Sequence, residues 1–175
     1  TDEIKNRIKI LGKTKQYQFI ITEIGGTVGD IESLPYIEAV RQLKWELGND
    51  CAVIHLTLLP YLATSGELKT KPTQHSVKLL LEYGVQPDIL VCRSEHPINK
   101  DIKRKIALFC NVSPESVIEA LDASTIYEVP LLMEKEKLDE IVLKRLHVTS
   151  HSEVQLDKWK NFLNKFHNPG KETTI

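Results

Sequence analysis

Cysteine is scarce in this chain of 175 residues, and the three that occur are not arranged for cross-linking. Cys51, Cys92 and Cys110 are odd in number, far apart in the sequence, and embedded in apolar runs. That pattern is typical of buried thiols in a reducing compartment, and it argues against a disulfide framework or a zinc site.

Excess charge and long apolar runs are lacking as well. The formal net charge is −1, and 41% of the residues are hydrophobic. A near-neutral chain does not bind nucleic acid by bulk electrostatics, although a local basic patch is still open. No segment approaches the roughly 20 apolar residues that cross a bilayer, and the first residues have no feature of a signal peptide. We therefore expect a cytoplasmic protein with neither a nucleic-acid nor a membrane partner.

The two ends of the chain indicate a segment of a longer protein. The chain begins with Thr1 rather than with methionine, and residues 170–175 read like a strand about to start. A chain of this length can bury one substantial core and carry one appendage. We expect one domain with a short extension.

The spacing of apolar residues alternates between helical and strand-like segments. It predicts strands at 18–24, 51–59, 88–93 and 117–120, and helices at 1–13, 34–47, 72–83, 101–110, 134–146 and 156–166. A long loop at 60–71 and a polar link at 147–152 complete the pattern. Such alternation implies an α/β fold in which helices cover both faces of a mostly parallel sheet.

A glycine-rich run from Glu23 to Pro35 holds three carboxylates and three glycines where the first predicted strand gives way to a helix. Ligands of open α/β sheets bind at that edge, and glycine lets backbone N–H groups approach a phosphate closely. Helix capping would also explain Asp30 and Glu32. Glu23, at the end of an apolar strand, needs a cation, and Mg²⁺ held by this carboxylate and by phosphates is the economical choice.

A second polar run, from Ser65 to His75, brings two lysines, two threonines and a glutamine to the start of a helix. Pro72 suits the first helical position, and free N–H groups there, together with Lys69 and Lys71, would bind an anion such as a nucleotide triphosphate. A solvated basic turn is the alternative. The loop follows the carboxyl end of a predicted strand, on the same edge as the glycine-rich run, and this placement favours the binding site.

The histidines carry less information. His55 lies in an apolar strand and is interpreted as a core residue, while His75 is equally compatible with a substrate contact and a helix cap. No pair of histidines has the spacing of a metal site. Lys105 ends a basic run, usually a solvated helix face, but it precedes apolar residues and could turn inward.

Four segments together resemble CTP synthase: 23–35, 65–77, 86–94 and 105–112. The match continues through 124–130 to the closing helix and covers nearly the whole chain. The resemblance is to the central and later part of the synthetase (amidoligase) domain, at residues 1–146. Residues 147–175 would be a linker and helix leading toward a glutaminase domain. The implied fold is P-loop synthetase-like, related to dethiobiotin synthetase, with the amino-terminal P-loop portion missing.

The resemblance implies an enzyme, a ligase of the glutamine amidotransferase type. In that family ATP, with Mg²⁺, phosphorylates the 4-oxygen of UTP, and ammonia derived from glutamine then displaces phosphate to give CTP. CTP is also a feedback inhibitor, and the expected assembly is a homotetramer.

The resemblance also implies roles for single residues. Glu23 would be a Mg²⁺ ligand, and Lys69 and Lys71 would be catalytic. The implied UTP and CTP site, partly across a subunit interface, consists of Asp30, Ile31, Glu32, Lys69, Thr70, Lys71, Pro72, Thr73, Gln74 and Lys105. The implied ATP site consists of Arg93, Leu121, Asp122 and Ala123. Leu121 and Ala123 depart from a common family pattern, so backbone contacts are expected there.

Three family features are absent from this chain: the P-loop with its lysine, a second metal-binding aspartate, and the nucleophilic cysteine of the glutaminase. The segment by itself should therefore not make CTP. One alternative is a non-catalytic module that binds nucleotides or mediates tetramerisation. Another is a relative in the dethiobiotin synthetase group, which should lack the loop at 69–75.

Overall fold

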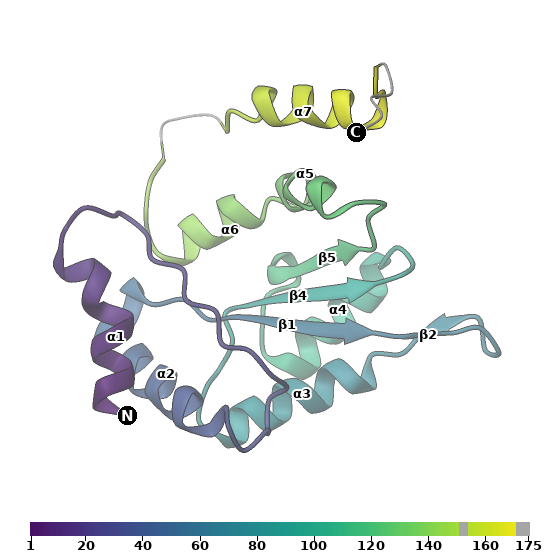
Figure 1. Ribbon diagram of the computed structural model, residues 1–175. Helices are drawn as coiled ribbons and strands as arrows, with labels where there is room; N and C mark the ends of the chain where they lie inside the picture. The colour runs from purple at the N-terminus through teal and green to yellow at the C-terminus, as the bar shows by residue number, and fades with distance from the viewer. Residues whose placement is uncertain (151–153, 171–175) are drawn as a thin grey trace.

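The computed structural model describes residues 1–150 and 154–170 and is built around a parallel sheet in the order β1-β4-β5 (Figure 1). The strands are β1 (Ile54–Leu59), β4 (Ile89–Ser94) and β5 (Val117–Leu121). Helices cover both faces of the sheet, as the alternating pattern predicts. The α/β fold class is therefore confirmed.

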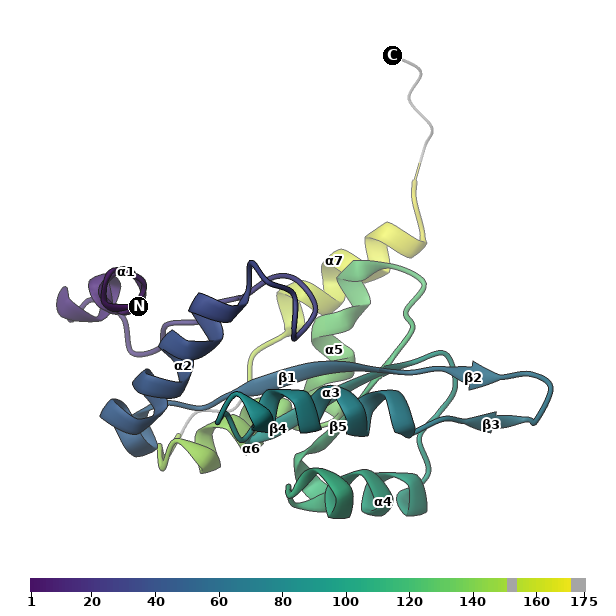
Figure 2. The same ribbon diagram turned by 90° about the horizontal axis from the view of Figure 1, so that it is seen from below.

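One face of the sheet packs against α3 (Lys71–Glu82) and α4 (Lys100–Cys110), as Figure 2 shows from that side. In the buried centre of this layer, Val77 of α3 and Ile106 of α4 pack against Leu59, Leu90 and Cys92 of the strands. The amide oxygen of the Asn99 side chain accepts the N–H of Ile102 and caps α4. This helix therefore begins one residue before its predicted start.

The opposite face packs against α5 (Val129–Lys135) and α6 (Leu138–Arg145). Met133 of α5 and Ile141 of α6 contact Ile89, Val91 and Ile118. The single helix predicted at 134–146 is wrong, because Lys137 adopts a left-handed conformation with φ of 60° and breaks it into two.

The first two helices, α1 (Asp2–Lys13) and α2 (Leu34–Leu47), lie beside one another at one side of the sheet (Figure 1). Lys5 and Lys9 donate to Glu46 across this contact, at 2.5 and 3.1 Å. Ile37 of α2 packs against Leu80 near the end of α3. The last helix, α7 (Asp157–His167), lies over α5.

Short elements fill the connections. The predicted loop at 60–71 contains an antiparallel hairpin of β2 (Tyr61–Leu62) and β3 (Glu67–Leu68), which projects beyond the sheet in Figure 1. Single 3₁₀ turns occur at η1 (Gly48–Asp50), η2 (Pro114–Ser116) and η3 (Ile126–Glu128). Parts of the predicted link at 147–152 and of the strand-like end, at 151–153 and 171–175, lie outside the described residues.

The strand predicted at 18–24 is wrong. The segment carries no strand pairing, and Tyr17, Phe19 and Ile21 are exposed, Ile21 at 96%. A strand is held by backbone hydrogen bonds to a neighbour, and within the described residues the outer edge of β1 pairs with no second strand. Alternate residues of β1, such as Leu56 and Leu58, are accordingly exposed as well.

The cysteines are unpaired thiols, as their positions predict. Cys92 and Cys110 are buried and Cys51 is half-buried. Burial raises the pKa of all three thiols, that of Cys110 to about 11. Within the described part of the chain, no helix is long and apolar enough to cross a membrane.

Candidate functional site

The three strands of the sheet end together at one edge. In the register of the sheet, Leu59 of β1 is level with Ser94 of β4, which is level with Leu121 of β5. The hairpin with its lysine-rich loop, the end of β4, and the turn after β5 therefore meet at this carboxyl edge (Figure 1). It is the edge at which ligands of open α/β sheets bind.

The lysine-rich loop returns from the hairpin to the start of α3. The backbone N–H of Lys69 donates to the carbonyl of Pro60 at 2.9 Å, which closes the loop next to the end of β1. The Lys69 ammonium pairs with Glu67, and this hydrogen bond lowers the pKa of Glu67. Lys71 is exposed, with its Nζ 5.6 Å from the ring centre of Phe109 in α4.

Thr70, Thr73 and Gln74 hold the start of α3 in place. The Thr73 side chain is fully buried, and its hydroxyl lies 3.1 Å from both the Thr57 hydroxyl and the carbonyl of Leu58 in β1. The Gln74 amide donates to the Thr70 hydroxyl at 3.1 Å. Thr70 makes no side-chain cap, so the N–H groups of the first turn keep their capacity to bind an anion.

Lys105 lies on the same side of the molecule as this loop. Its side chain is exposed on α4 and does not turn into the core. Lys105 is four residues before Phe109 on α4, so it lies on the helix face that carries the ring beside Lys71. Three cationic side chains, those of Lys69, Lys71 and Lys105, therefore gather near the start of α3.

The turn after β5 is joined to the end of β4. Arg93 donates from Nε to Asp122 Oδ1 at 3.0 Å, and the backbone N–H of Asp122 donates to the carbonyl of Ser94 at 3.0 Å. Leu121 and Ala123 on either side are half-buried. The ion pair between Arg93 and Asp122 is exposed, so it contributes little to stability and can be exchanged for contacts with a ligand.

The glycine-rich run does not reach this edge, contrary to its predicted position. A Cβ on Gly29, where φ is 104°, would lie 2.7 Å from the side chain of Leu79. Leu79 is eight residues beyond Lys71, which is about 12 Å along the axis of α3. Without the predicted strand at 18–24, nothing carries the run to the carboxyl edge.

Within the glycine-rich run, the polar side chains serve local structure or face outward. Asp30 Oδ2 accepts the N–H of Thr27 at 2.9 Å, and Ser33, not Asp30, is the residue at the start of α2. Glu23, Ile31 and Glu32 are exposed. Across residues 1–150 and 154–170, no three His, Cys, Asp or Glu side chains gather into a metal site. Glu23 is exposed and ends no strand, so its charge does not require a cation, and its role as a Mg²⁺ ligand stays a prediction.

The histidines divide as the sequence indicates. His55 is a core residue whose Nε2 lies 2.8 Å from the hydroxyl of Ser76, and burial lowers its pKa. His75 is exposed. His96 is exposed, and its ring packs against the Tyr61 ring with centroids 4.0 Å apart. Each residue follows the end of a strand, but the strand order β1-β4 is what makes these two ends neighbours.

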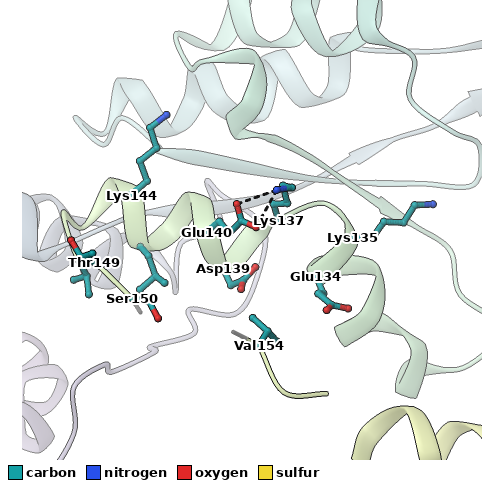
Figure 3. Close-up of a pocket in the computed structure, with 11 residues that line it drawn as sticks. Glu134, Lys135, Lys137, Asp139, Glu140, Lys144, Thr149, Ser150 and Val154 are labelled. Carbon is teal, nitrogen blue, oxygen red and sulfur yellow. Dashed lines mark hydrogen bonds and ion pairs between the residues drawn. The ribbon is translucent and has the colours of Figure 1, made fainter. Parts of the chain in front are cut away.

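A cavity of about 870 Å³ lies elsewhere, between α6 and the segment after it (Figure 3). Its lining includes basic and acidic side chains, and Lys137 and Glu140 form an ion pair at 3.2 Å beside it. None of the predicted site residues lines this cavity. It is therefore not part of the candidate site.

The parallel sheet, its helical layers, and the basic groups at its carboxyl edge define the chain as an α/β domain of the P-loop synthetase-like class. A family model described as the N-terminus of CTP synthase matches residues 1–148, and the chain belongs to this family. The comparison places the match in the N-terminal part of the family. It does not support the narrower prediction of a central or later part.

Curated relatives agree over the whole chain. A CTP synthase of Christiangramia forsetii is 63% identical to all of this chain, which covers 32% of that protein. A CTP synthase of Cytophaga hutchinsonii is 62% identical, with 33% of its length covered, and one of Porphyromonas gingivalis is 55% identical, with 32% covered. The chain thus spans about a third of the length of the curated relatives it matches.

Proposed function

We propose that this chain is a segment of an enzyme that converts UTP to CTP with ATP and with ammonia from glutamine, and that it supplies the nucleotide-binding carboxyl edge of the sheet. The observation that carries the proposal is the meeting of two polar groups there. The lysines around the start of α3 form one group, and the Arg93–Asp122 turn forms the other. Two nucleotides must lie side by side for phosphoryl transfer, and one edge of a parallel sheet offers adjacent places for both.

The pyrimidine nucleotide is assigned to the start of α3. Lys69, Lys71 and Lys105 neutralise its phosphates, and the free N–H groups of the first turn add hydrogen bonds to them. Thr70, Pro72, Thr73 and Gln74 fix the turn that presents those groups. Lys69 and Lys71 also stabilise the negative charge that shifts during phosphoryl transfer, which is their catalytic role.

ATP is assigned to the Arg93 end of the edge, where residues 121–123 offer backbone groups and Arg93 offers a guanidinium to phosphates. Glu23 is assigned to the Mg²⁺ that accompanies ATP on the resemblance to CTP synthase alone, because the run that carries Glu23 does not reach the edge where ATP is placed. Asp30, Ile31 and Glu32 are assigned to the pyrimidine ring of UTP or of inhibitory CTP. Because the glycine-rich run lies along α3 away from the lysines, we assign the completion of that site to a neighbouring subunit of a homotetramer.

We further propose the division of the chain into residues 1–146, belonging to the synthetase domain, and 147–175, a linker and helix leading toward a glutaminase domain. The cytoplasmic location stays a prediction. A second candidate function applies to the chain on its own: a module that binds nucleotides or mediates tetramerisation without turnover. The chain covers about a third of the length of its relatives, and this favours binding without turnover for the chain on its own. Binding of UTP without ATP hydrolysis is the result it predicts.

The assignment of ATP is tested by Arg93→Ala in a full-length CTP synthase that carries this segment. Loss of one charge-assisted contact corresponds to about a tenfold change, so we expect KM for ATP to rise about tenfold while KM for UTP stays unchanged. The measurement is steady-state, ammonia-dependent CTP formation. Arg104→Ala, at an exposed position of α4, is the matched control. Equal effects on both substrates, or no CTP formation by the unmodified protein, would overturn the assignment.

A further inference from the structure

The last helix of the chain docks close to the proposed ATP turn. α7 lies over α5 (Figures 1 and 2), contacts Tyr127 of η3, and buries Leu163. The match to the CTP synthase N-terminus ends at residue 148, before this helix begins.

Tyr127 of η3 is the centre of that docking. Its ring is surrounded by the rings of Trp159, Phe162 and Phe166, with centroids 6.3, 5.1 and 5.5 Å away in edge-to-face arrangements. The indole N–H of Trp159 also donates to the backbone carbonyl of Tyr127 at 2.8 Å. The hydrogen bond from Trp159 holds the backbone at Tyr127, and the ring contacts hold the Tyr127 side chain.

A polar contact strengthens the same attachment. His167 Nε2, near the end of α7, lies 3.0 Å from Glu128 Oε1. The other oxygen of Glu128 accepts the backbone N–H of Ser124 at 3.1 Å. The hydrogen-bonded path thus runs from α7 through Glu128 back to the residue that follows Ala123.

The sheet holds the start of the segment that runs from the end of β5 to α5, residues 121–128. Asp122 is fixed to β4 through Arg93 and through the carbonyl of Ser94. Residues 121–128 therefore form a short connection with one end attached to β4 and the other to α7. Residues 123–128 have no strand pairing, so they are held at one end by Asp122 and at the other by the start of α5 and by the contacts with α7.

We infer that α7 holds the turn after β5 in its nucleotide-binding form, and that Trp159 is the positioning residue through which it acts. The inference rests on the proposed ATP role of residues 121–123. Trp159 touches no substrate in this account. If undocking of α7 leaves the turn competent for about a tenth of the time, the apparent Kd for ATP rises about tenfold.

The first test is amide hydrogen exchange of this chain with Trp159→Ala. Exchange of the amides at 123–128 is expected to speed up about tenfold, while the amides of β4 keep their protection. Trp159→Phe keeps a ring but loses the N–H, and it is expected to give an intermediate rate. Asn161→Ala, at an exposed position of the same helix, is the control and should change nothing. If β4 also loses protection in Trp159→Ala, the comparison is made with Trp159→Phe. Faster exchange at 123–128 with β4 still protected then supports the inference, and unchanged exchange at 123–128 overturns it.

The second test is the affinity of the same variants for Mg-ATP and Mg-UTP, measured by calorimetry. Trp159→Ala is expected to weaken Mg-ATP binding about tenfold and to leave Mg-UTP binding unchanged, a selectivity that general loss of structure would not produce. Unchanged exchange at 123–128 in Trp159→Ala would overturn the inference, and so would equal weakening of both nucleotides. If the unmodified chain binds no Mg-ATP, the proposed ATP role fails, and the exchange experiment still decides whether α7 positions the turn.

Discussion

Replacing Asp88 by asparagine is expected to lower the free energy of unfolding by about 3 kcal/mol, because the change leaves two partly buried cations without their counter-ion. Asp88 Oδ2 accepts from Lys44 Nζ at 2.5 Å and from the N–H of Val53 at 2.8 Å. Its Oδ1 accepts from Arg145 Nε at 2.7 Å. One carboxylate, only 10% exposed and just before β4, thus joins α2, α6 and the residue that precedes β1.

Urea unfolding of this chain measures the effect. Asp101→Asn is the control, because that side chain is 91% exposed and its change should stay near 0.5 kcal/mol. A loss in Asp88→Asn no larger than in this control would contradict the role of the carboxylate as a tie between elements.

The stabilising effect of Asp88 also has a defined pH dependence. Burial alone would raise the pKa of Asp88, but hydrogen bonds from Lys44, Val53 and Arg145 together outweigh it, so the net pKa is lowered. A carboxyl group with a lowered folded-state pKa stabilises the fold above its unfolded pKa, about 3.9, and loses this effect as pH falls through the folded value. The difference between the unmodified chain and Asp88→Asn should therefore be constant above about pH 5 and shrink in acid. A difference that grows as pH falls would contradict this assignment.

The second large effect concerns the lysine-rich loop. Replacing Lys69 and Lys71 together by alanine in a full-length CTP synthase that carries this segment is expected to lower kcat/KM for UTP at least 100-fold. Each lysine makes a charge-assisted contact worth about 1.5 kcal/mol or more, and about 2.8 kcal/mol corresponds to a factor of 100. Since the two side chains also stabilise charge in the transition state, kcat should fall along with the affinity for UTP.

Lys78→Ala is the matched control, because Lys78 is an exposed lysine of the same helix, about two turns beyond the loop. It should retain full activity. If the double variant changed kcat/KM for UTP no more than Lys78→Ala does, the lysines would be a solvated basic turn, the alternative that the sequence leaves open.

Local sequence pattern predicts best the helices and strands that pack against neighbouring elements of the described structure. The helix at 34–47 has the predicted bounds, and β4 and β5 lie within one residue of theirs. Each buries an apolar stripe or a continuous apolar run against neighbours that are present, so local periodicity and final environment agree. The same holds for His55, whose apolar surroundings in the sequence correspond to a buried ring.

The failures arise where structure depends on something that periodicity does not report. The segment at 18–24 has the composition of a buried strand, but a strand also needs a paired neighbour, and composition cannot show whether one is present. The break before α6 depends on the backbone of Lys137, a residue type with no marked preference for a left-handed conformation. The contact between Tyr61 and His96 joins two connections, and it becomes visible only when the strand order is known.

For the candidate site, the sequence indicated the lysine-rich loop correctly as the start of a helix at a strand end. Its motifs also singled out Arg93 and residues 121–123, and the fold brings these to the same edge. It misplaced the glycine-rich run, because that expectation relied on the strand at 18–24. A site assembled from several strand ends is predicted only as well as the least certain of its strands.

Calorimetric titration of this chain with Mg-UTP and Mg-CTP, beside the Lys69→Ala, Lys71→Ala double variant, measures whether the carboxyl edge of the sheet binds a pyrimidine nucleotide. Circular dichroism of each sample shows that it is folded. The account predicts saturable binding of both nucleotides by the unmodified chain and its loss in the double variant. A folded, unmodified chain that binds neither nucleotide, or a double variant that binds as tightly as the unmodified chain, would contradict the claim that the carboxyl edge of this sheet holds a pyrimidine nucleotide.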